Sequence, residues 1–413
     1  MKRDRVIVVG AGHASAQLCV SLRQGGWDGE IALVGDEPSL PYQRPPLSKT
    51  FLHGTTTLTD LLIRGPDFYE KEDVTFRHAR VTGIDREAGT VALDDGDALS
   101  YDRLVLCTGA RPRPLDVPGA DLAGVHALRD AADIEAIRGT LRTARRAVIV
   151  GAGYIGLEAA ASLRKLGIEV AVLEVADRVL QRVTAPEVSA FYDRVHREEG
   201  VDLRTGVGVA GFEGDWHVRA VRLTDGAEIP ADLVVVGVGV LPNVELARDA
   251  GLAVENGIVV DEHGRTDDPR IFAAGDCANH YDARYGTRMR LECVANALEH
   301  AKAIAGAICG KEKPISALPW FWSGQYDLKL QIAGLSTGHD EVVLRGDPAD
   351  GRSFACFYLA DGRLIAADCV NRPKEFMFSK RAITQELSPD RVLLADPDTP
   401  LVSLLQTPAR SAR

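Results

Sequence analysis

The chain has 413 residues, of which 46% are hydrophobic and 26% are charged, and its formal net charge is −11. The length allows two or three domains, and the acidic balance argues against a nucleic-acid-binding protein, which would need a basic surface. No apolar run approaches the roughly 18 residues of a membrane-spanning helix. The seven cysteines are scattered without a C-x-x-C pair, which favours reduced thiols in a cytoplasmic protein and disfavours a metal site.

The chain opens with a predicted β-strand at residues 6–9, whose apolar stretch is too short for a secretory signal. The motif Gly-x-Gly-x-x-Ser at 10–15 follows it and has the spacing of a turn that binds a dinucleotide pyrophosphate at a helix start. The next strand is expected at 31–34. Asp36 or Glu37 at its end is a candidate ligand of a ribose hydroxyl.

A proline-rich loop at residues 38–49 leaves this module. We expect it to hold two cations, Arg44 and Lys49, rigidly near the ligand, because ligands bind at the ends of such strands. A surface loop with solvated charges is the alternative. A β-hairpin is predicted over 81–93, and a strand at 104–106 returns to the sheet.

The same plan returns in the middle of the chain, with a strand at 147–150 and the motif Gly-x-Gly-x-x-Gly at 151–156. The following strand ends at Glu174, roughly 20 residues after the first glycine, where a carboxylate can accept from a ribose 2′-hydroxyl. This carboxylate would repel a 2′-phosphate, and no arginine follows at 175–176, so NADH is favoured over NADPH. Arg178 leaves a phosphate contact open.

The duplication extends further, because 102–109 and 232–239 each contain an Asp, an apolar strand and a Gly. Two similar modules in tandem predict two bound dinucleotides, most simply FAD and a nicotinamide cofactor. Around the second module we expect helices at 130–143 and 186–199 and strands at 207–212, 218–223 and 233–236.

Two later segments point to a flavin. A short strand at 271–273 runs into Gly275 and Asp276, and Asp276 is either a ligand of a ribityl hydroxyl or a helix cap. A long helix is expected to open at 290–297 and to run to residue 309, with its amides available to the flavin.

The remainder of the chain predicts a strand-rich third domain. Its aromatic segment at 319–323 contains Trp320 and Trp322, and it is either core or a cofactor contact. Strands are expected at 328–332, 341–344, 353–359 and 364–370, with a helix at about 374–386. The last residues, 407–413, are predicted to be disordered.

These motifs together resemble the FAD-dependent ferredoxin reductases of bacterial oxygenase systems, which serve haem-thiolate monooxygenases and aromatic-ring dioxygenases. The resemblance runs in order from residue 6 to about 385. The matching stretches are RPPLSK (44–49), CTGARPRPL (107–115), GAGYIGLE (151–158), RVTAPEVSAFY (182–192), GVGVLPN (237–243), AAGDCA (273–278), RLECVANA (290–297), PWFWSGQYDLKLQ (319–331) and VNRPKEF (370–376).

The resemblance implies an α/β fold that is glutathione-reductase-like, with two Rossmann-like dinucleotide-binding domains and a C-terminal α+β domain. The FAD domain is expected at 1–110 and 242–316. The NAD domain is expected at 111–241, and the C-terminal domain, which would cover the flavin, at 317–413.

The resemblance also implies site residues. Lys49 would lie beside the flavin and pair with Glu158, so that both tune the flavin, and Trp322 would lie near its ring system. With the motifs above, the set expected for FAD is Gly10, Gly12, His13, Ala14, Ser15, Asp36, Glu37, Arg44, Pro45, Lys49, Val81, Thr108, Gly109, Arg129, Gly275, Asp276, Glu292, Val294, Ala297 and Trp322. The set expected for NAD(H) is Gly151, Gly153, Tyr154, Ile155, Gly156, Glu158, Glu174, Arg182, Gly237, Val238 and Gly239. Two positions depart from the family, which usually has Asp at Gly324 and Ala at Cys107.

The expected reaction is hydride transfer from NADH to FAD, followed by two one-electron steps to a [2Fe–2S] ferredoxin. No metal site is expected in the chain itself. Disulfide reductases are disfavoured because the loop at 36–49 contains no cysteine. A rubredoxin or small-molecule reductase, or an NADH-binding flavoprotein that signals through a partner, remains an alternative.

The expected partner creates a charge conflict, since ferredoxins of this type are acidic and the chain carries −11. A local basic patch would resolve it, and solvated surface charges are the alternative reading. The candidates are Arg372, Lys374, Lys380 and Arg381, with Arg64, Arg288 and Arg290 as others. A monomer or weak dimer is expected.

Overall fold

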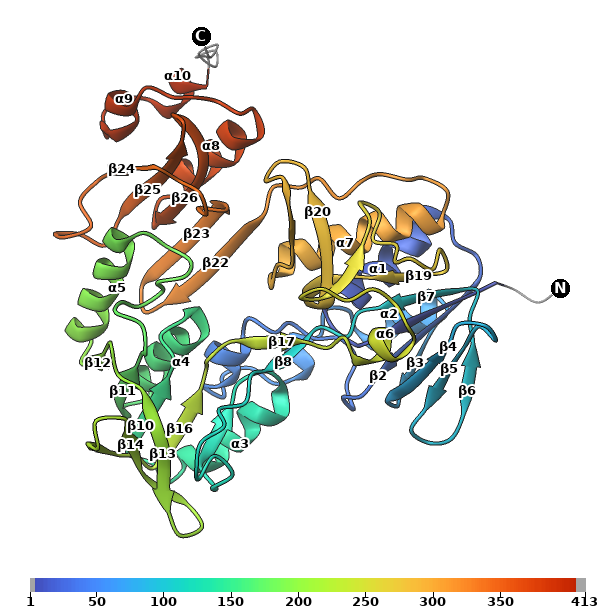
Figure 1. Ribbon diagram of the computed structural model, residues 1–413, viewed down its shortest axis with the longest axis horizontal. Helices are drawn as coiled ribbons and strands as arrows, with labels where there is room; N and C mark the ends of the chain where they lie inside the picture. Colours follow the sequence, from blue (N-terminus) through green and yellow to red (C-terminus); the bar gives the residue numbers. More distant parts are fainter. Residues whose placement is uncertain (1–3, 406–413) are drawn as a thin grey trace. The chain divides into compact units, whose positions relative to one another are not determined.

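The computed structural model describes residues 4–405, so the predicted disorder at 407–413 lies outside the described residues. The chain divides into two compact units (Figure 1). The first unit consists of Met1–Arg44, Thr56–Arg111 and Val240–Ala317. The second consists of Pro45–Thr55, Pro112–Gly239 and Leu318–Arg413.

A five-stranded parallel sheet forms the centre of the first unit. Its strand order is β19 (Ile271–Ala273), β7 (Arg103–Leu106), β1 (Arg5–Val9), β2 (Glu30–Gly35) and β3 (Val74–His78). Val6, Ile7 and Val8 of the central strand have no exposed surface. Such continuous apolar strands are typical of a parallel sheet that is covered on both faces.

Two helices, α1 (His13–Gly25) and α7 (Val294–Ile308), pack against each other on one face of this sheet (Figure 1). The other face is covered by a small antiparallel sheet of β4 (Val81–Asp85), β5 (Thr90–Leu93) and β6 (Ala98–Ser100), together with α6 (Glu245–Asp249). The remaining elements of this unit are η2 (Thr59–Leu61), α2 (Pro66–Lys71), β18 (Ile258–Val260), η3 (Gly275–Cys277), β20 (Ala278–Asp282) and β21 (Thr287–Met289). The strands β8 (Ala110–Pro112) and β17 (Val240–Pro242) lie where the chain passes from one unit into the other.

A second parallel sheet forms one half of the second unit. Its order is β12 (Asp202–Arg204), β11 (Glu169–Leu173), β10 (Arg146–Val150), β16 (Leu233–Val236) and β9 (Val125–Ala127). An antiparallel sheet of β13 (Val209–Gly214), β14 (Val218–Leu223) and β15 (Glu228–Pro230) shares a hydrophobic core with it. The helices of this half are α3 (Ala131–Leu141), α4 (Tyr154–Lys165) and α5 (Pro186–Glu198).

The two parallel sheets repeat one arrangement, as the duplicated sequence motifs predict. In each, the glycine turn follows the central strand, which lies between the strand that comes next in the chain and the last strand of the module. The repeated aspartates have the same task. Asp102 accepts a hydrogen bond from the backbone N–H of Arg5 at 2.7 Å, and Asp232 accepts one from Arg146 at 3.0 Å. Each carboxylate therefore holds the start of the central strand of its own sheet.

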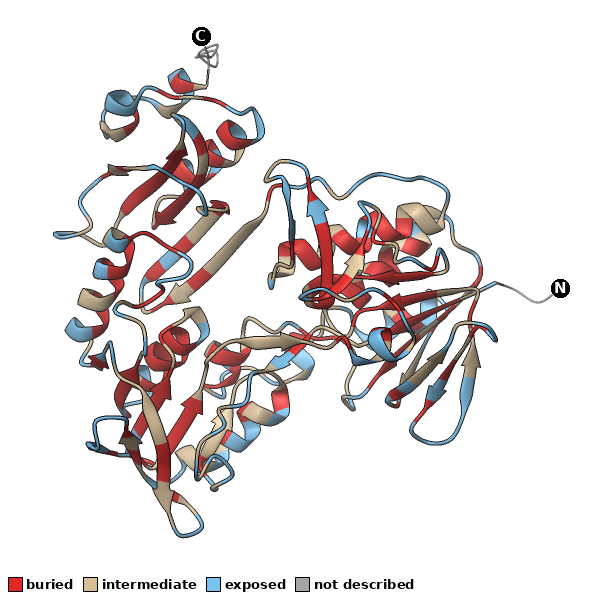
Figure 2. Cartoon of the chain, viewed as in Figure 1, coloured by how far each residue is buried: buried red, intermediate tan, exposed pale blue. Residues whose placement is uncertain are grey.

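The other half of the second unit is an antiparallel sheet. Its order is β22 (Trp320–Gln325), β23 (Leu328–Gly334), β26 (Arg363–Val370), β25 (Phe354–Ala360) and β24 (Glu341–Arg345). Helix α8 (Pro373–Thr384) packs on it, and β25 and β26 are almost entirely buried (Figure 2). Two short helices, α9 (Arg391–Ala395) and α10 (Leu401–Leu404), complete the described chain.

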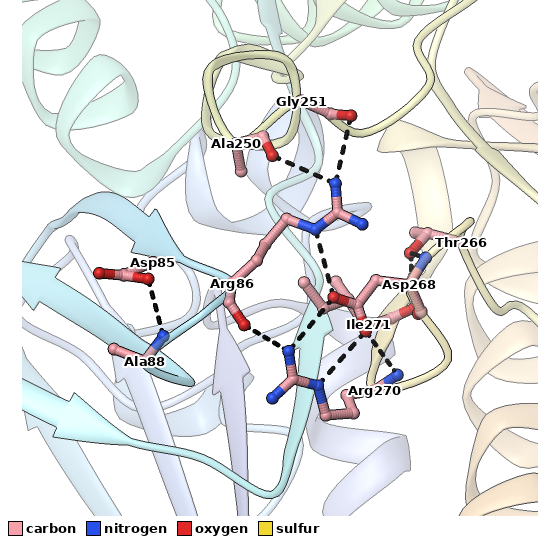
Figure 3. Close-up of polar contacts among 9 residues, drawn as sticks. All are labelled: Asp85, Arg86, Ala88, Ala250, Gly251, Thr266, Asp268, Arg270 and Ile271. Carbon is pink, nitrogen blue, oxygen red and sulfur yellow. Dashed lines mark hydrogen bonds and ion pairs between the residues drawn. The ribbon is translucent and has the colours of Figure 1, made fainter.

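An ion-pair cluster around the buried Asp268 carboxylate joins three segments of the first unit (Figure 3). The Asp268 carboxylate accepts from Arg86 Nε at 3.2 Å and from the Arg270 backbone N–H at 3.0 Å. The Arg86 guanidinium also donates to the carbonyls of Ala250 and Gly251. Burial alone would raise the pKa of Asp268, but the hydrogen bonds from Arg270 and Arg86 lower it overall. The cluster ties the end of β4 to the loop after α6 and to the turn before β19.

Strands β3, β9 and β12 were not predicted, and three of the segments that the sequence linked to the cofactors differ from expectation. Helix α7 begins at Val294 rather than at 290, and the Cys293 sulfur caps it by accepting from Asn296 N at 3.4 Å. The proline-rich loop continues into a π-helical turn, η1 (Leu47–Phe51). The aromatic segment after residue 319 forms the edge strand β22.

Candidate functional site

The glycine turn of the first unit has the shape of an anion-binding cradle. Gly10 has φ +103°, and a Cβ added there would lie 2.2 Å from the carbonyl oxygen of Cys107. A Cβ added at Gly12 would meet no atom within 4 Å. The first position therefore requires glycine for close packing, and the second leaves open space at the start of α1 for a phosphate. Ser15 Oγ accepts from Gly12 N at 2.9 Å and so fixes the turn from within.

Two carboxylates lie at the end of β2, and they have different surroundings. Glu37 accepts from the Tyr42 hydroxyl at 2.5 Å and pairs with Arg44. Asp36 is the more exposed of the two and lies 3.7 Å from Arg80 in a hollow of about 140 Å³. Asp36 is therefore the better candidate for a ribose ligand, and Arg44 acts first as the partner of Glu37.

The Gly-Asp turn after β19 faces the starts of both helices. A Cβ added at Gly275 would lie 3.5 Å from Ala14 Cβ and 3.6 Å from Ala297 Cβ. Asp276 lies inside the 3₁₀ turn η3, whose N-cap is Ala274 without a side-chain cap. Asp276 is therefore not the N-cap of this turn, and its role as a ligand of a ribityl hydroxyl stays a prediction.

A residue that the sequence reasoning missed holds this turn. His300, on α7, accepts from the Gly275 backbone N–H through Nδ1 at 3.2 Å. Its side chain is fully buried, and burial lowers the pKa of His300 to about 3. The imidazole is therefore neutral, as an Nδ1 acceptor must be. A histidine in the middle of a helix carries no sequence signal for this contact.

The other residues expected for FAD in this unit have structural partners. Thr108 donates to the carbonyl of Asn243 at 2.7 Å, next to Gly109. Glu292 pairs with Arg290 at 2.8 Å just before α7. Val81 begins β4 and is buried, and Val294 and His13 are the first residues of α7 and α1. Pro45, Lys49, Arg129 and Trp322 belong to the second unit, and their assignment to FAD stays a prediction.

The glycine turn of the second unit repeats the cradle. Gly151 has φ +104°, and a Cβ added there would lie 2.4 Å from the Gly237 carbonyl oxygen. A Cβ at Gly156 would lie 2.1 Å from the Gly151 carbonyl oxygen, so helix and strand pack too closely for any side chain. A Cβ at Gly153 would meet nothing within 4 Å. The open space again lies at the helix start, here that of α4.

Glu174 is bound to the turn itself. Its carboxylate accepts from the backbone N–H of Ala152 at 2.7 Å and from that of Ala176 at 2.9 Å. The acid that is predicted to bind the ribose thus also holds the glycine turn in place.

The segment after Glu174 brings other predicted residues together. Arg182 has a guanidinium nitrogen 3.8 Å from a Cβ built at Gly239, and Val238 packs against the adjacent core. Arg178 donates to the carbonyls of Thr184 and Gln181, at 2.8 and 3.1 Å. Arg178 is therefore engaged in holding its own loop, which supports NADH over NADPH.

A buried carboxylate links the helix of this turn to Lys49. Glu158 lies on α4, and one of its oxygens accepts from Lys49 Nζ at 2.5 Å and from Ser48 Oγ at 2.8 Å. The other accepts from Ser323 Oγ at 2.7 Å. The structure thus confirms the expected contact between Lys49 and Glu158. It adds two serines that sequence reasoning missed, although both lie inside motifs that it quoted.

Position 324, where the chain departs from the family, lies next to this pair. A Cβ added at Gly324 would be 3.6 Å from Lys49 Cε, which is ordinary van der Waals contact. Glu158 is therefore the acidic partner of Lys49 within the described residues, and position 324 contributes no second carboxylate.

An aromatic row follows the same strand. Phe321 packs against Tyr154, the first residue of α4, with ring centroids 5.0 Å apart, whereas Ile155 beside it is exposed. Trp320 and Trp322 stack at 5.3 Å, and Lys380 lies over the Trp320 ring. Trp320 also contacts the core residue Phe376, so the row serves partly as core.

The thiols offer no redox-active pair. All seven cysteines lie in the described chain and none forms a disulfide. Burial raises the pKa of every one of them, so the reactive thiolate form is disfavoured. Within residues 4–405, no group of three or more His, Cys, Asp or Glu side chains is arranged to hold a metal ion. The same residues include no helix that is both long and apolar enough to cross a membrane.

The fold and the two open glycine cradles define a flavin- and nicotinamide-dependent oxidoreductase, and comparison with known proteins agrees. Residues 4–301 match the pyridine nucleotide-disulphide oxidoreductase family, and residues 320–405 match the reductase C-terminal family. The chain belongs to the FAD-dependent ferredoxin reductases of bacterial oxygenase systems.

Three relatives illustrate the match. Putidaredoxin reductase from Pseudomonas putida is 47% identical over 97% of both chains. The ferredoxin–NAD(+) reductase component of the anthranilate 1,2-dioxygenase system of Burkholderia cepacia is 40% identical over 98% of this chain and 100% of its own. The solved structure of a covalent putidaredoxin reductase–putidaredoxin complex covers 97% of this chain and 98% of its own, with a TM-score of 0.94 at 47% identity.

Proposed function

We propose that the chain carries electrons from NADH to a [2Fe–2S] ferredoxin that feeds a bacterial oxygenase. The observation that carries this proposal is the course of α4. The helix begins at the glycine turn predicted for NADH and one turn later presents Glu158 to Lys49. The residues expected to bind the donor and to tune the flavin therefore share one rigid element. The absence of a cysteine from the loop at 36–49, and of a disulfide among the seven cysteines, speaks against a disulfide reductase with the same fold.

FAD, when bound, turns a two-electron donor into a source of single electrons. The residues present fit it, because Gly12 leaves open space at the start of α1 while Gly10 packs against the neighbouring strand. We assign the pyrophosphate to this turn, a ribose to Asp36 and the ribityl chain to the turn at Gly275 and Asp276. We assign to Lys49, held by Glu158, the positive charge that tunes the flavin.

The division of labour within the chain follows from these assignments. We assign FAD binding to 1–110 and 242–316, NADH binding to 111–241, and a covering role to 317–413. The segment Pro45–Thr55 belongs to the second unit, and its Lys49 forms an ion pair with Glu158 of the same unit. We place the protein in the cytoplasm, where thiols that form no disulfide are stable.

We propose that the ferredoxin-docking patch lies on and beside α8. Arg290 is almost fully buried and paired with Glu292, and Arg288 donates to the carbonyls of Val260 and Asn279. Lys374 and Arg381 are exposed on α8, and neither makes an ion pair within the described residues. We therefore favour the group on and beside α8, whose members are Arg372, Lys374, Lys380 and Arg381. Arg64, which is exposed, stays a second candidate.

The test is NADH-driven reduction of a [2Fe–2S] ferredoxin from the same source, beside NADPH and ferricyanide. We expect fast reduction with NADH and slow reduction with NADPH, and a rate that falls with salt if α8 docks an acidic partner. Fast reduction of ferricyanide without reduction of ferredoxin would support the alternative, a rubredoxin or small-molecule reductase or a signalling flavoprotein. A rate of ferredoxin reduction that does not change with salt would contradict the assignment of the docking patch to α8.

A further inference from the structure

A buried hydrogen-bond network connects the NADH-binding half of the second unit to its C-terminal sheet. Tyr358 on β25 and Asp368 on β26 are fully or almost fully buried. The Thr184 hydroxyl donates to the Asp368 carboxylate at 2.5 Å, and the Tyr358 hydroxyl donates to the same oxygen at 2.6 Å. The backbone N–H of Ala185 donates to the Tyr358 hydroxyl at 3.0 Å. Two residues of the C-terminal sheet therefore hold two consecutive residues of the other half.

The segment that they hold is also attached to the glycine turn. Leu180 has φ +54°, which is strained for a leucine, and its N–H donates to the carbonyl of Ala152 at 3.1 Å. Arg178 donates to the Thr184 carbonyl from inside the loop. Arg182 lies between these two attachments, with its guanidinium beside Gly239. The position of Arg182 is thus decided by anchors at both ends of a short segment.

The anchor on the C-terminal sheet is stronger than an ordinary hydroxyl pair. Asp368 makes no ion pair among residues 4–405, and burial raises its pKa to about 6, so it is mostly ionised at neutral pH. Hydrogen bonds to an ionised acceptor are about twice as strong as neutral ones. A buried carboxylate that receives two hydroxyls therefore holds Thr184 in one place.

We propose that Asp368 and Tyr358 are positioning residues for NADH binding. They hold Thr184 and Ala185 and thereby place Arg182 where the nicotinamide dinucleotide binds. This inference rests on the NADH site in the proposed function. It adds a role for the C-terminal sheet in binding the electron donor.

The test is Tyr358→Phe, which removes only the hydroxyl. We expect the KM and the Kd for NADH to rise about tenfold, because the 184–185 anchor is lost. We expect kcat at saturating NADH to stay within twofold and the FAD-to-protein ratio to stay unchanged. This split between KM and kcat separates a positioning role from a general loss of structure.

The matched control is Tyr192→Phe. Burial, and next the charge of Asp368, raise the pKa of Tyr192, so this tyrosine lies in the same neighbourhood. Its buried hydroxyl makes no hydrogen bond in the described chain. The control variant should bind NADH like the wild type. Equal KM and Kd values in the two variants would overturn the inference.

Thr184→Val provides a second route if Tyr358→Phe does not fold. It should raise the KM for NADH in the same direction. Asp368→Asn, which keeps an acceptor but loses the charge, should also raise the KM, by less than Thr184→Val does. In the double variant Thr184→Val/Tyr358→Phe, the loss of NADH binding free energy should be smaller than the sum of the losses in the two single variants, because both side chains act through one carboxylate. A wild-type protein that does not bind NADH would overturn the proposed function itself, whereas a normal wild type with an unaffected Thr184→Val would overturn only the inference.

Discussion

At the scale of single residues, one side chain often serves both the fold and the site. Glu158 receives hydrogen bonds from Lys49, Ser48 and Ser323, so the charge of Lys49 is fixed in one place. Glu174 holds the backbone of the glycine turn that it helps to complete. Substitutions at such residues should therefore change ligand binding and local order together.

The donor preference can be reversed at Glu174. In Glu174→Arg we expect the KM for NADH to rise, since the Ala152 and Ala176 amides lose their acceptor. We expect the ratio of kcat/KM for NADPH over NADH to increase at least about tenfold, because a guanidinium attracts the 2′-phosphate that a carboxylate repels. Steady-state kinetics with both donors measure this ratio.

Glu174→Gln is the control, because it keeps an acceptor for the turn while removing the charge. The glutamine substitution should weaken NADH binding less than the arginine substitution does. The glutamine variant should also bind NADPH less tightly than the arginine variant. Unchanged donor kinetics in the arginine variant would sink the assignment of Glu174 to the ribose.

At the scale of elements, polar side chains decide where strands and helices begin and how their ends are joined. Asp102 and Asp232 hold the starts of the two central strands. Asp268 joins three loop segments through Arg86 and Arg270 (Figure 3). His300 attaches the Gly-Asp turn to α7. These contacts bring together parts of the chain that are far apart in sequence.

The Asp268 cluster should be measurable as stability. In Asp268→Asn, the two guanidiniums keep their positions but lose their counter-charge. We expect the free energy of unfolding to fall by about 2 kcal/mol. This value is below the range for fully buried ion pairs because both arginines are partly exposed. In a unit of this size the Tm should fall by roughly 4–8 °C. Scanning calorimetry of the holoenzyme measures the shift.

Asp267→Asn is the matched control for this variant. Asp267 is the adjacent residue, it is exposed, and it makes no ion pair among the described residues. Its variant should keep the wild-type Tm within about a degree. Equal Tm values for the two variants would show that the cluster does not stabilise the unit.

At the scale of the whole molecule, each of the two units contains a buried histidine that resists protonation. His196 on α5 bonds to Gln325 and Tyr326, and burial lowers its pKa to about 4. His300 in the first unit has its pKa lowered to about 3. An unfolded histidine titrates near 6.5, so the stability that each neutral ring contributes is present above that pH and is lost as the pH falls toward the folded-state value.

Acid should therefore weaken both units. As the pH falls from 7 to 5, we expect each histidine to lower the free energy of unfolding of its unit by about 2 kcal/mol. Asp368, with its raised pKa, acts in the opposite direction and raises the free energy of unfolding of the second unit by about 1 kcal/mol over the same pH change. His196→Gln, which keeps polar atoms but cannot titrate, should shift the acid unfolding midpoint to lower pH, as followed by tryptophan fluorescence. A midpoint that does not move would show that His196 is not responsible.

The sequence by itself determined the architecture and most of the cradle residues. The glycine motifs, the alternation of strands and helices and the repeated aspartates are local patterns, and each has a local physical cause in backbone geometry or in strand burial. The central strands of the two parallel sheets, helix α5 and strands β23 to β26 followed from them with errors of a few residues at their ends, whereas the outer strands β3, β9 and β12 were not predicted. The family resemblance also predicted the contact between Lys49 and Glu158, which the structure contains.

Only the tertiary structure decided which side chains meet across long stretches of chain. Ser48, Glu158 and Ser323 converge from three segments, as do Thr184, Tyr358 and Asp368. That Asp276 is not the N-cap of its turn could be seen only from the backbone of that turn. Such contacts depend on the packing of whole elements, and a single buried Ser, His or Asp has no period or spacing that announces its partner.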